Sequence, residues 1–492
     1  MKLKNRFSSL LEHLMETAEL KNYTLANELQ YDVSYISKWV SGRMLPSAKT
    51  DRTVLQGISR CLVNQGSSDG VRKLMADYQV NNPEDLYSAI YDNLVAEYNY
   101  VRDTQNDTGN TIAPDTLFFP RLNMPQFLSK MRHPVLRRVN SLEIMSMMDL
   151  MYMERDYRLQ LASIDSRVQV QQFRYPDVHF SMFIDINNDK LDHIYDITFL
   201  LNMLTNMTHI DFQLYGGKQA FGKAIFAVKD EFCISGMLTD SNHCMSVTVS
   251  EDQDNSNAMY DYIRSLCTRE RQLLLQIPMQ LLLVNNSYAQ SVLSTNQKLR
   301  IGHMTERFLP TDLFEELVTQ LGTTHKEVIS ADELRWVHIL TKRSYEELPI
   351  QIIFNSSAFA DFAVSGNLNF FDANIKLTPG QRLRHVTHIR DLIRDHENLA
   401  LRMVHGRMIS DFHYNANQCI SLSDSSACVR LSTAGQNTIH LINHADMKEA
   451  FTRYFDAVWN YSADVVISNR QEIITQLEHI IHQIEMITRL TH

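Results

Sequence analysis

The residues best suited to chemistry with a partner form a short polar run near the N-terminus, SYISKWVSGRMLPS (residues 34–47). Ser34, Ser37 and Lys38 bring two hydroxyl groups and an ammonium group within five positions, and Tyr35 adds a phenol. Such groups hydrogen-bond to base edges and to phosphate oxygens. The run therefore indicates either a helix that reads a nucleic acid or an ordinary solvated surface helix, and its surroundings must decide between the two.

Four short helices are expected to position this run, at about 7–18, 24–29, 33–41 and 53–62. In the first helix, the residues that share an apolar stripe are Phe7, Leu10, Leu11, Leu14 and Ala18. In the third, Ile36 with Trp39 or Val40 recurs at spacings of three and four, so these side chains should point into the bundle. The helices thus predict a compact bundle that turns the polar run outward.

The ends of the third helix carry recognisable signals. Asp32 stands where its side chain can cap the helix N-terminus. Gly42 can end the helix in a left-handed conformation, and Pro46 begins the next turn. Arg43 then lies beside the helix end, well placed for a phosphate.

Charge is distributed unevenly along the chain. Residues 1–66 hold 9 Lys and Arg against 6 Asp and Glu, a net charge of +3, whereas residues 67–492 hold 38 against 51, a net charge of −13. Only the first segment is expected to be drawn to phosphates.

The run TLANELQYDVSYISKWVSGRMLPS, with its tail I-S-K-W-x-x-G-R-x-x-P-S, resembles the helix-turn-helix of Cro-type and Xre-type repressors over roughly residues 5–63. The resemblance implies binding to double-stranded DNA as a homodimer. The DNA-contacting residues would be Asn22, Thr24, Val33, Ser34, Tyr35, Ser37, Lys38 and Arg43. The chain departs from the family at Gln30, where Gly is usual in the turn, and at Asn22, where Gln is frequent. Gln30 should therefore strain the turn slightly or shape it differently.

Length and composition predict several folded domains. The chain has 492 residues, of which 44% are hydrophobic and 21% charged, and Gly (15) and Pro (11) are scarce. We expect an α+β multidomain fold: a helix-turn-helix bundle (1–66), a helical connector and linker (67–116), two tandem α/β modules (117–290 and 291–465) and a long C-terminal helix (466–492). The linker is expected at 103–116, DTQNDTGNTIAPDT.

The two modules are suggested by a faint internal repeat. AIFAVKDEFCIS, CMSVTVS and the helical NSNAMYDYIRSL match in order CISLSDSSACVR, NTIHLIN and MKEAFTRYFDAV. Each set predicts strand, turn, strand, strand and helix. Further strands are expected at SLEIMSMMDLMYM, HFSMFIDI, HIDFQLYG, PIQIIF, FADFAVSG and NLALRMV.

The segment FGKAIFAVKDEFCISGML weakly resembles the strand-turn-strand centre of phospholipase D-like domains, which also occur as non-catalytic effector domains. Active members carry H-x-K-x-x-x-x-D there. Alignment on Asp230 places Lys223 and Ile225 at the His and Lys positions, and alignment of the second copy on Asp424 places Asn417 and Cys419 there. Since neither copy has the nucleophile or its phosphate-binding partner, we expect no enzyme activity.

Other catalytic or metal signals are faint. His385 and His388 share a helix face, but a metal would need further ligands, and we expect neither a metal nor a cofactor. Gly216-Gly217 lacks the spacing of a phosphate loop and is expected to be a turn. The arginines of the same helix as His385 either pair with acidic residues or line a pocket for an anion.

The C-terminal helix carries an apolar seam that includes Ile473, Leu477 and Ile484. The seam fits either a coiled coil with a partner helix or packing of the helix on its own domain, and the sequence alone does not distinguish the two.

Together these patterns predict a cytoplasmic bacterial or phage-related regulator, repressor-like and dimeric, with a non-catalytic effector region. No apolar run is long enough to span a membrane, and the six scattered cysteines suit a reducing compartment. The sequence leaves open whether the effector is a small molecule, a peptide or a protein. Two alternatives remain, a DNA-targeted phosphodiesterase or nuclease-like enzyme and a repressor controlled by a protein partner.

Overall fold

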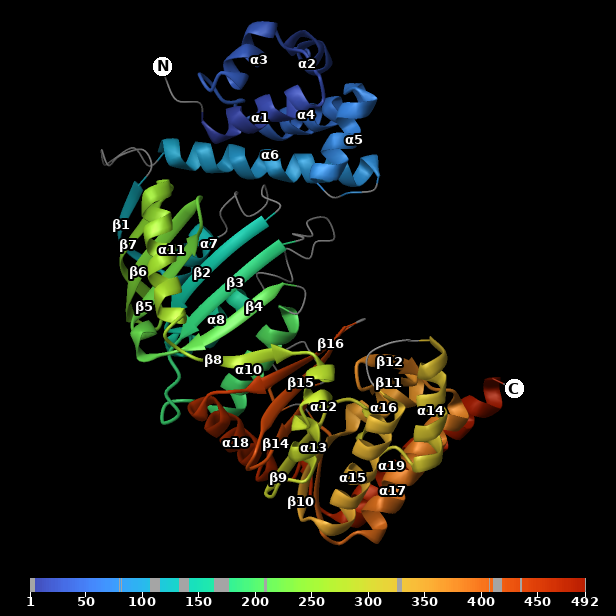
Figure 1. Cartoon of the computed structure of the whole chain (residues 1–492). Coiled ribbons are helices and arrows are strands. Elements are labelled where there is room, and N and C mark those ends of the chain that lie inside the picture. The colour runs from blue at the N-terminus through green and yellow to red at the C-terminus, as the bar shows by residue number, and fades with distance from the viewer. Residues whose placement is uncertain are drawn as a thin grey trace. The chain divides into compact units, whose positions relative to one another are not determined.

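The computed structural model describes residues 5–78, 80, 82–106, 116–131, 141–162, 177–207, 210–324, 330–406, 408–409, 418–433 and 436–491. The fold is α+β, with helices up to residue 106, strands and helices mixed beyond, and a long final helix (Figure 1). The chain divides into two compact units that alternate along the sequence. Unit 1 comprises Met1–Met147, Tyr152–Phe180 and Gly222–Arg264, and unit 2 comprises Met148–Met151, Ser181–Phe221 and Ser265–His492. The sequence-based domain boundaries at 66, 116, 290 and 465 stay predictions. The helix expected over 466–492 begins later, at Arg470, because Val466 and Ile467 form a short strand.

The N-terminal part of unit 1 is a helical bundle, drawn in blue in Figure 1. Its helices are α1 (Arg6–Thr17), α2 (Asn22–Leu29), α3 (Val33–Val40), α4 (Asp51–Gln65), α5 (Ser68–Asp77) and α6 (Pro83–Asn106). The apolar stripe expected on the first helix is buried in the bundle core, and α6 packs against α1 and α4. The expected linker starts too early, because α6 continues to Asn106 on buried contacts such as Tyr98 and Val101. Residues 107–115 of that linker lie outside the described residues.

The remainder of unit 1 is built on antiparallel strands. In order across the sheet these are β1 (Thr116–Asn123), β7 (His243–Ser250), β6 (Phe232–Asp240), β5 (Lys223–Val228) and β2 (Ser141–Met148). The pairs β1–β7, β7–β6 and β6–β5 are antiparallel. Helices α7 (Met124–Met131), α8 (Arg155–Ala162) and α11 (Gln253–Cys267) accompany them. Strand β3 (Asp177–Ile184) is divided between the two units.

Unit 2 contains a mixed sheet. Its strand order is β4 (Asp211–Gly216), β8 (Gln272–Ile277), β16 (Gln436–Ile442), β15 (Ala427–Thr433), β14 (Cys419–Leu422), β9 (Gln297–Ile301), β10 (Ile350–Asn355), β13 (Leu399–Val404) and β17 (Val466–Ile467). β9, β10 and β13 are parallel, and the other pairs are antiparallel. Parallel strands need long crossovers, which helices supply here.

The helices of unit 2 complete its core. They are α10 (His193–Asn206), α12 (Met279–Val284), α13 (Ser287–Val292), α14 (Thr311–Thr324), α15 (Ala331–Glu347), α16 (Ser356–Ser365), α17 (Pro379–Asp395), α18 (Ala445–Trp459) and α19 (Arg470–Thr491), with the 3-10 turns η3 (Lys218–Ala220) and η4 (Glu306–Phe308). A small hairpin, β11 (Asn367–Phe370) with β12 (Ala373–Lys376), follows α16. None of the helices that the structure describes has the length and apolar character needed to cross a membrane.

The internal repeat is present in the structure. β5, β6, β7 and α11 follow one another as three antiparallel strands and a helix, and so do β14, β15, β16 and α18. The likeness extends one strand further. β8, which follows α11, pairs antiparallel with β4, and β17, which follows α18, pairs antiparallel with β13.

The strand expected at FADFAVSG is wrong, because these residues belong to helix α16. Phe359, Phe362 and Ala363 are buried, and their spacing of three and four follows one face of a helix. Gly366 ends the helix in the left-handed region at φ 72°. The alternation of apolar and small residues suggested a strand. The same residues also fit the period of a helix, and Gly366 can end that helix, which is the structure observed.

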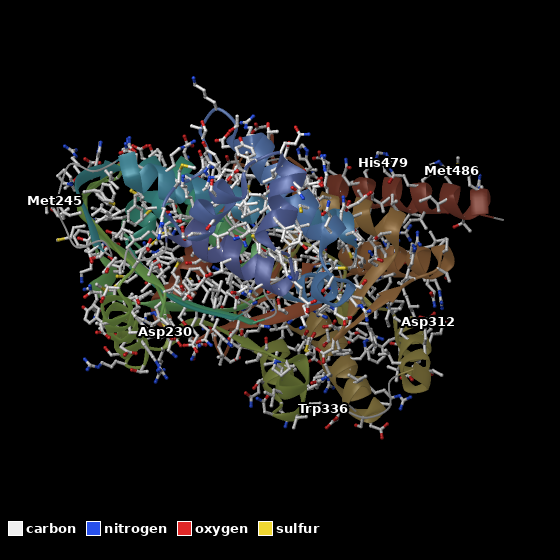
Figure 2. All side chains as sticks on the ribbon, turned by 90° about the horizontal axis from the view of Figure 1, so that it is seen from above. Asp230, Met245, Asp312, Trp336, His479 and Met486 are labelled. Atoms are coloured by element: carbon white, nitrogen blue, oxygen red, sulfur yellow. The ribbon has the colours of Figure 1, made fainter. Side chains whose placement is uncertain are left out.

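The seam of the C-terminal helix packs within unit 2. Ile473, Leu477 and Ile484 are fully buried in the unit 2 core, and α19 packs against α16 and α17. The opposite side of α19 carries His479 and Met486, which are exposed (Figure 2). Of the two interpretations of this seam, packing on its own domain is therefore the one the structure shows for these three residues.

Candidate nucleic-acid interface

The turn between α2 and α3 is tight and strained. Gln30 adopts a left-handed conformation, with φ 55° and ψ 39°, and the Tyr31 amide donates to the Ala26 carbonyl at 3.0 Å. A left-handed residue with a side chain costs about 1–2 kcal/mol. The small strain predicted for Gln30 is therefore present.

Two large side chains fix α3 to the bundle. Ile36 is 0% and Trp39 1% exposed, and both belong to the bundle core. The Tyr31 ring packs on Trp39 with centroids 5.2 Å apart. Val40 is only half-buried, so Trp39 is the second anchor. The remaining residues of the helix up to Lys38, at positions 33, 34, 35, 37 and 38, are all exposed.

Both ends of α3 are closed as the sequence predicted. Asp32 Oδ1 accepts a hydrogen bond from the Ser34 amide at 2.8 Å. Hydrogen bonds from Ser34 lower the pKa of the Asp32 carboxyl, so the cap is ionised. Gly42 follows α3 at φ 74°, and a Cβ there would lie 2.9 Å from Ser8 Oγ. Only glycine meets both demands at this position.

The outward face of α3 combines apolar and polar groups. Val33 is 44% and Tyr35 43% exposed, while Ser34, Ser37 and Lys38 are also exposed. The Lys38 ammonium group lies 5.4 Å from the centre of the Tyr35 ring. A face with hydroxyls, one cation and two apolar groups can hydrogen-bond to base edges and contact thymine methyl groups.

The other predicted contact residues surround this face unequally. Arg43 is exposed beyond the C-terminal end of α3. Asn22 and Thr24, on the first turn of α2, are half-buried. The structure thus leaves Arg43 freely accessible, whereas Asn22 and Thr24 expose only part of their side chains.

Two cations near α4 were not predicted as contacts. Lys49 and Arg52 are exposed on either side of Thr50, the residue before α4. The Thr50 hydroxyl lies 3.5 Å from the Tyr31 hydroxyl, and the Tyr31 ring also packs edge-on against Tyr35. Tyr31 therefore links the start of α4 to the exposed face of α3. The basic run AKTDR (residues 48–52) was the available signal.

Nearby carboxylates are engaged elsewhere in the bundle. Asp51 lies 3.8 Å from Arg102 of α6, and Glu28 accepts a hydrogen bond from Gln65 at 2.6 Å. Residues 1–66 carry a net charge of +3 within a chain of net charge −10. Residues 1–66, which hold α1 to α4, are therefore the part of the chain that an anionic polymer would approach, since α5 and α6 together carry more acidic than basic residues.

The positions aligned with the phospholipase D-like motif lie on hairpins, as expected. Lys223 begins β5 and Ile225 is 7% exposed in the same strand. Asp230, labelled in Figure 2, accepts hydrogen bonds from Gln253 and Asn257, each at 2.9 Å. These hydrogen bonds join the turn after β5 to α11.

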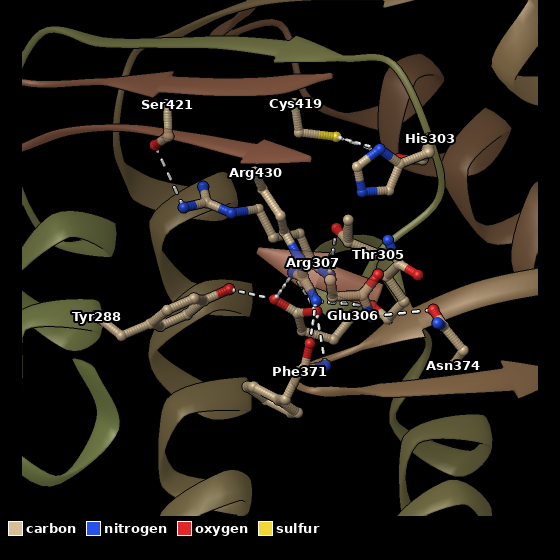
Figure 3. A network of polar contacts seen from close by, with 12 residues as sticks. Tyr288, His303, Thr305, Glu306, Arg307, Phe371, Asn374, Cys419, Ser421 and Arg430 are labelled. Atoms are coloured by element: carbon tan, nitrogen blue, oxygen red, sulfur yellow. Dashed lines mark hydrogen bonds and ion pairs between the residues drawn. The ribbon is translucent and has the colours of Figure 1, made fainter. Parts of the chain in front are cut away.

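The second copy differs in one respect. Asn417 lies outside the described residues, and Asp424 accepts hydrogen bonds from Thr295 (2.6 Å) and Asn296 (2.8 Å). Cys419, at the lysine position, lies 3.6 Å from His303 Nδ1 (Figure 3). Burial raises the pKa of the Cys419 thiol, but the charge and hydrogen bonds of His303 outweigh burial and lower that pKa to about 7.

The other sequence candidates have structural roles. His385 is fully buried edge-on against Phe362, and burial lowers its pKa to about 3, so it is neutral. Arg384 pairs with Asp312 (2.8 Å) and Glu316 (2.6 Å), so the prediction of pairing holds for it. Among the described residues, no group of three or more His, Cys, Asp or Glu is arranged to hold a metal ion.

A buried polar network in unit 2 was missed entirely from the sequence (Figure 3). The Glu306 carboxylate accepts hydrogen bonds from Arg430 Nη1 at 2.8 and 2.9 Å and from the Tyr288 hydroxyl at 2.6 Å. Burial raises the pKa of Glu306, but Arg430 and Tyr288 outweigh burial and the net pKa is lowered. Residues 288, 306 and 430 are far apart in the sequence, so no local pattern revealed them.

Comparisons with known proteins add little. No family model matches the chain, and no curated protein does. Among solved structures, the chain is similar to TrmBL2, described as an archaeal chromatin protein with a novel mode of DNA binding. The two share 11% sequence identity, and the similarity covers 54% of this chain and 98% of that chain at a TM-score of 0.23. At so low a TM-score the similarity carries no argument about fold or function.

Proposed function

We propose that this chain binds double-stranded DNA through α3 and acts as a sequence-specific transcription regulator of the repressor type. The observation that carries the proposal is the two-sided construction of α3. Ile36 and Trp39 fix the helix in the bundle core, while Ser34, Ser37 and Lys38 remain exposed. A recognition helix must be held rigidly by its scaffold and offer its polar side chains to the major groove.

We assign the surrounding residues to phosphate contacts and α3 to base contacts. Arg43, Lys49 and Arg52 are exposed cations of the bundle, and cations of this kind contact the DNA backbone without reading its sequence. Asn22 and Thr24 offer an amide and a hydroxyl at the first turn of α2, whose N-cap Lys21 makes no side-chain capping hydrogen bond. A helix N-terminus of this kind favours an anion.

We further propose a homodimer with a non-catalytic effector region. One recognition helix contacts few base pairs, so two copies about 34 Å apart are needed for useful specificity. Ile473, Leu477 and Ile484 are buried within unit 2, so we do not assign the dimer contact to these residues. Lys223, Ile225 and Cys419 supply neither the histidine nucleophile nor its lysine partner, which favours binding over phosphodiesterase chemistry.

The proposal is tested by selecting fragments from a random duplex DNA pool with the purified full-length chain. The selection is made at about 150 mM salt, where purely electrostatic binding is weak. We expect enrichment of one two-fold symmetric site. The Ser34→Ala/Lys38→Ala variant should fail to enrich that site while keeping the circular dichroism of the parent chain, since both side chains are exposed.

A matched variant controls for charge alone. Arg72→Ala removes one exposed cation from α5, where Arg72 pairs with Asp69 at 3.3 Å and lies outside the α2–α3 segment. This variant should enrich the same site as the parent chain. If the double variant enriches the site equally well, α3 is not the reading helix.

A further inference from the structure

Unit 2 contains a cavity of about 70 Å³ between its helices and its sheet, and this cavity is partly open to solvent. Met279, Leu282, Leu299, Ile301, Ile439 and Leu441 form most of its apolar wall. The polar wall comes from α13, η4, β14 and β15, which contribute Ser291, Arg307, Ser421 and Arg430. An apolar cavity with a few convergent polar groups is the usual form of a small-molecule site.

The two arginines of this wall differ in how their charge is balanced. Arg430 is 7% exposed and holds the Glu306 carboxylate with Nη1, while its Nη2 donates to the carbonyls of Asn369 (3.2 Å) and Phe371. Tyr288 completes the shell of Glu306 (Figure 3). One guanidinium and one carboxylate therefore neutralise each other within a closed network.

Arg307 has no such counterpart. Its Nη2 donates to the Ser421 hydroxyl at 3.3 Å, and its guanidinium carbon lies 5.6 Å from the centre of the Tyr288 ring. Within the described ranges no carboxylate forms an ion pair with Arg307, and the adjacent Glu306 is occupied by Arg430. A guanidinium stays charged at any physiological pH, so this side of the cavity carries a positive charge that no carboxylate pairs with among the described residues.

Polar atoms of the wall also lack partners. Ser291 is 8% exposed, and its hydroxyl forms no hydrogen bond with the described residues. The same holds for Nε of Arg430. A buried polar group without a partner costs free energy, and few remain in folded proteins. Both residues line the cavity, so a ligand there can satisfy groups that the chain leaves unpaired.

We propose that this cavity binds a small organic carboxylate with a short apolar tail. Arg307 holds the carboxylate, with the hydroxyls of Ser421 and Ser291 beside it. The tail lies against the aliphatic side chains of the wall. The cavity volume limits the ligand to a few heavy atoms, and the aliphatic wall disfavours a multiply charged phosphate, which needs more polar contacts than the wall offers. The inference concerns unit 2 alone and is independent of DNA binding by α3.

The test is isothermal titration calorimetry of the full-length chain with propanoate. The matched neutral probe is propanamide, and the purely ionic probe is inorganic phosphate. We expect saturable binding of the carboxylate at one site per chain and none of the amide or the phosphate. Equal binding of the carboxylate and the amide overturns the proposal, and so does the absence of saturable carboxylate binding.

Three variants assign the binding to the cavity. Arg307→Gln should weaken carboxylate binding roughly 10- to 100-fold, as expected for the loss of a charged hydrogen-bonding partner. Ser291→Leu fills the cavity without changing its charge and should also abolish binding, which keeps the test decisive if Arg307→Gln folds poorly. Arg335→Gln, which removes a surface arginine paired with Glu315 at 3.0 Å, should bind as the parent chain does. Unchanged affinity in both cavity variants overturns the proposal.

Discussion

Lys38 on α3 and Arg430 on β15 hold a positive charge in opposite ways. Lys38 is exposed, and the contact recorded for its ammonium group is the face of Tyr35 at 5.4 Å. Arg430 is 7% exposed and is balanced by Glu306. An exposed cation is held by water and stays available to a partner, whereas a buried cation must be neutralised inside the fold. Lys38 is therefore available to other molecules, whereas the charge of Arg430 is neutralised within unit 2.

The largest difference between buried and exposed charge should appear when a carboxylate is neutralised. Glu306→Gln leaves Arg430 buried without an anion and should reduce the free energy of unfolding of unit 2 by about 3–5 kcal/mol. Urea denaturation followed by tryptophan fluorescence in a Trp39→Phe background reports unit 2, because the chain has three tryptophans and Trp336 and Trp459 belong to that unit.

The matched surface change is Glu315→Gln. Glu315 pairs with Arg335 at 3.0 Å, and its side chain is 44% exposed. An exposed pair contributes about 0–1 kcal/mol, so the loss should be small. Equal losses in the two variants would contradict the distinction between buried and exposed charge.

Acid should destabilise unit 2 through its buried histidines. Burial lowers the pKa of His385 to about 3 and the pKa values of His338 and His440 to about 4. The unfolded chain protonates these rings near pH 6.5, but the folded unit keeps them neutral. Their contribution is therefore full above pH 6.5 and is lost as pH falls toward 3–4, by up to about 1.4 kcal/mol per pH unit for each ring.

Denaturant unfolding between pH 7 and pH 4 measures this slope. His385→Leu places an apolar side chain against Phe362. The free energy of unfolding should then depend less steeply on pH, by the contribution of one histidine ring. A slope identical to that of the parent chain would show that His385 is protonated in the folded unit.

The end of α3 should respond to a single methyl group. Gly42→Ala places a side chain at φ 74° and 2.9 Å from Ser8 Oγ, which should cost the bundle about 1–2 kcal/mol. Trp39 fluorescence in a chain lacking Trp336 and Trp459 follows the bundle during urea denaturation. Gly380→Ala in α17 is the control, because a Cβ there meets nothing within 4 Å and its φ lies outside the left-handed region. Its effect is measured on unit 2, by the fluorescence of Trp336 and Trp459 in a Trp39→Phe background. Equal effects of the two changes would contradict the conformation assigned to Gly42.

The smallest effect is expected for a cation that contacts only phosphate. If Lys49 makes one phosphate contact, Lys49→Ala should weaken binding evenly across DNA sequences and reduce the salt-dependence slope by about 1. Fluorescence anisotropy with a labelled duplex at several salt concentrations measures this slope. Lys73→Ala, an exposed cation of α5, should leave the slope unchanged. A change in sequence preference on loss of Lys49 would instead place that residue at a base edge.

The sequence predicts well those features that depend on neighbouring residues. The cap by Asp32, the turn at Gln30, the anchors Ile36 and Trp39 and the left-handed Gly42 all lie within 13 positions. Each follows from local geometry, so the bundle and the orientation of α3 could be expected before the structure. The repeat of three strands and a helix was detectable for the same reason, since order and spacing survive when identity is low.

The cavity and its network depend on contacts that no local pattern contains. Glu306 and Arg430 are separated by 124 positions, and strand order alone brings them together. In the sequence, Glu306 and Arg307 appear as an ordinary charged pair in GHMTERFLP. The prediction of a strand at FADFAVSG was wrong because a short apolar run fits both the two-residue period of a strand and the 3.6-residue period of a helix. Packing against the rest of unit 2 stabilises the helix. The strand order of the sheet must be known before Glu306 and Arg430 can be assigned to one network.

The central claim is that α3 reads DNA, and the most direct test compares affinities for the selected duplex. Fluorescence anisotropy at about 150 mM salt is measured for the parent chain, for Ser34→Ala/Lys38→Ala and for Arg72→Ala. We predict that the double variant loses about 1–3 kcal/mol for each base contact removed and that Arg72→Ala binds like the parent chain. Equal affinity of the double variant and the parent chain would contradict the assignment of α3 as the recognition helix.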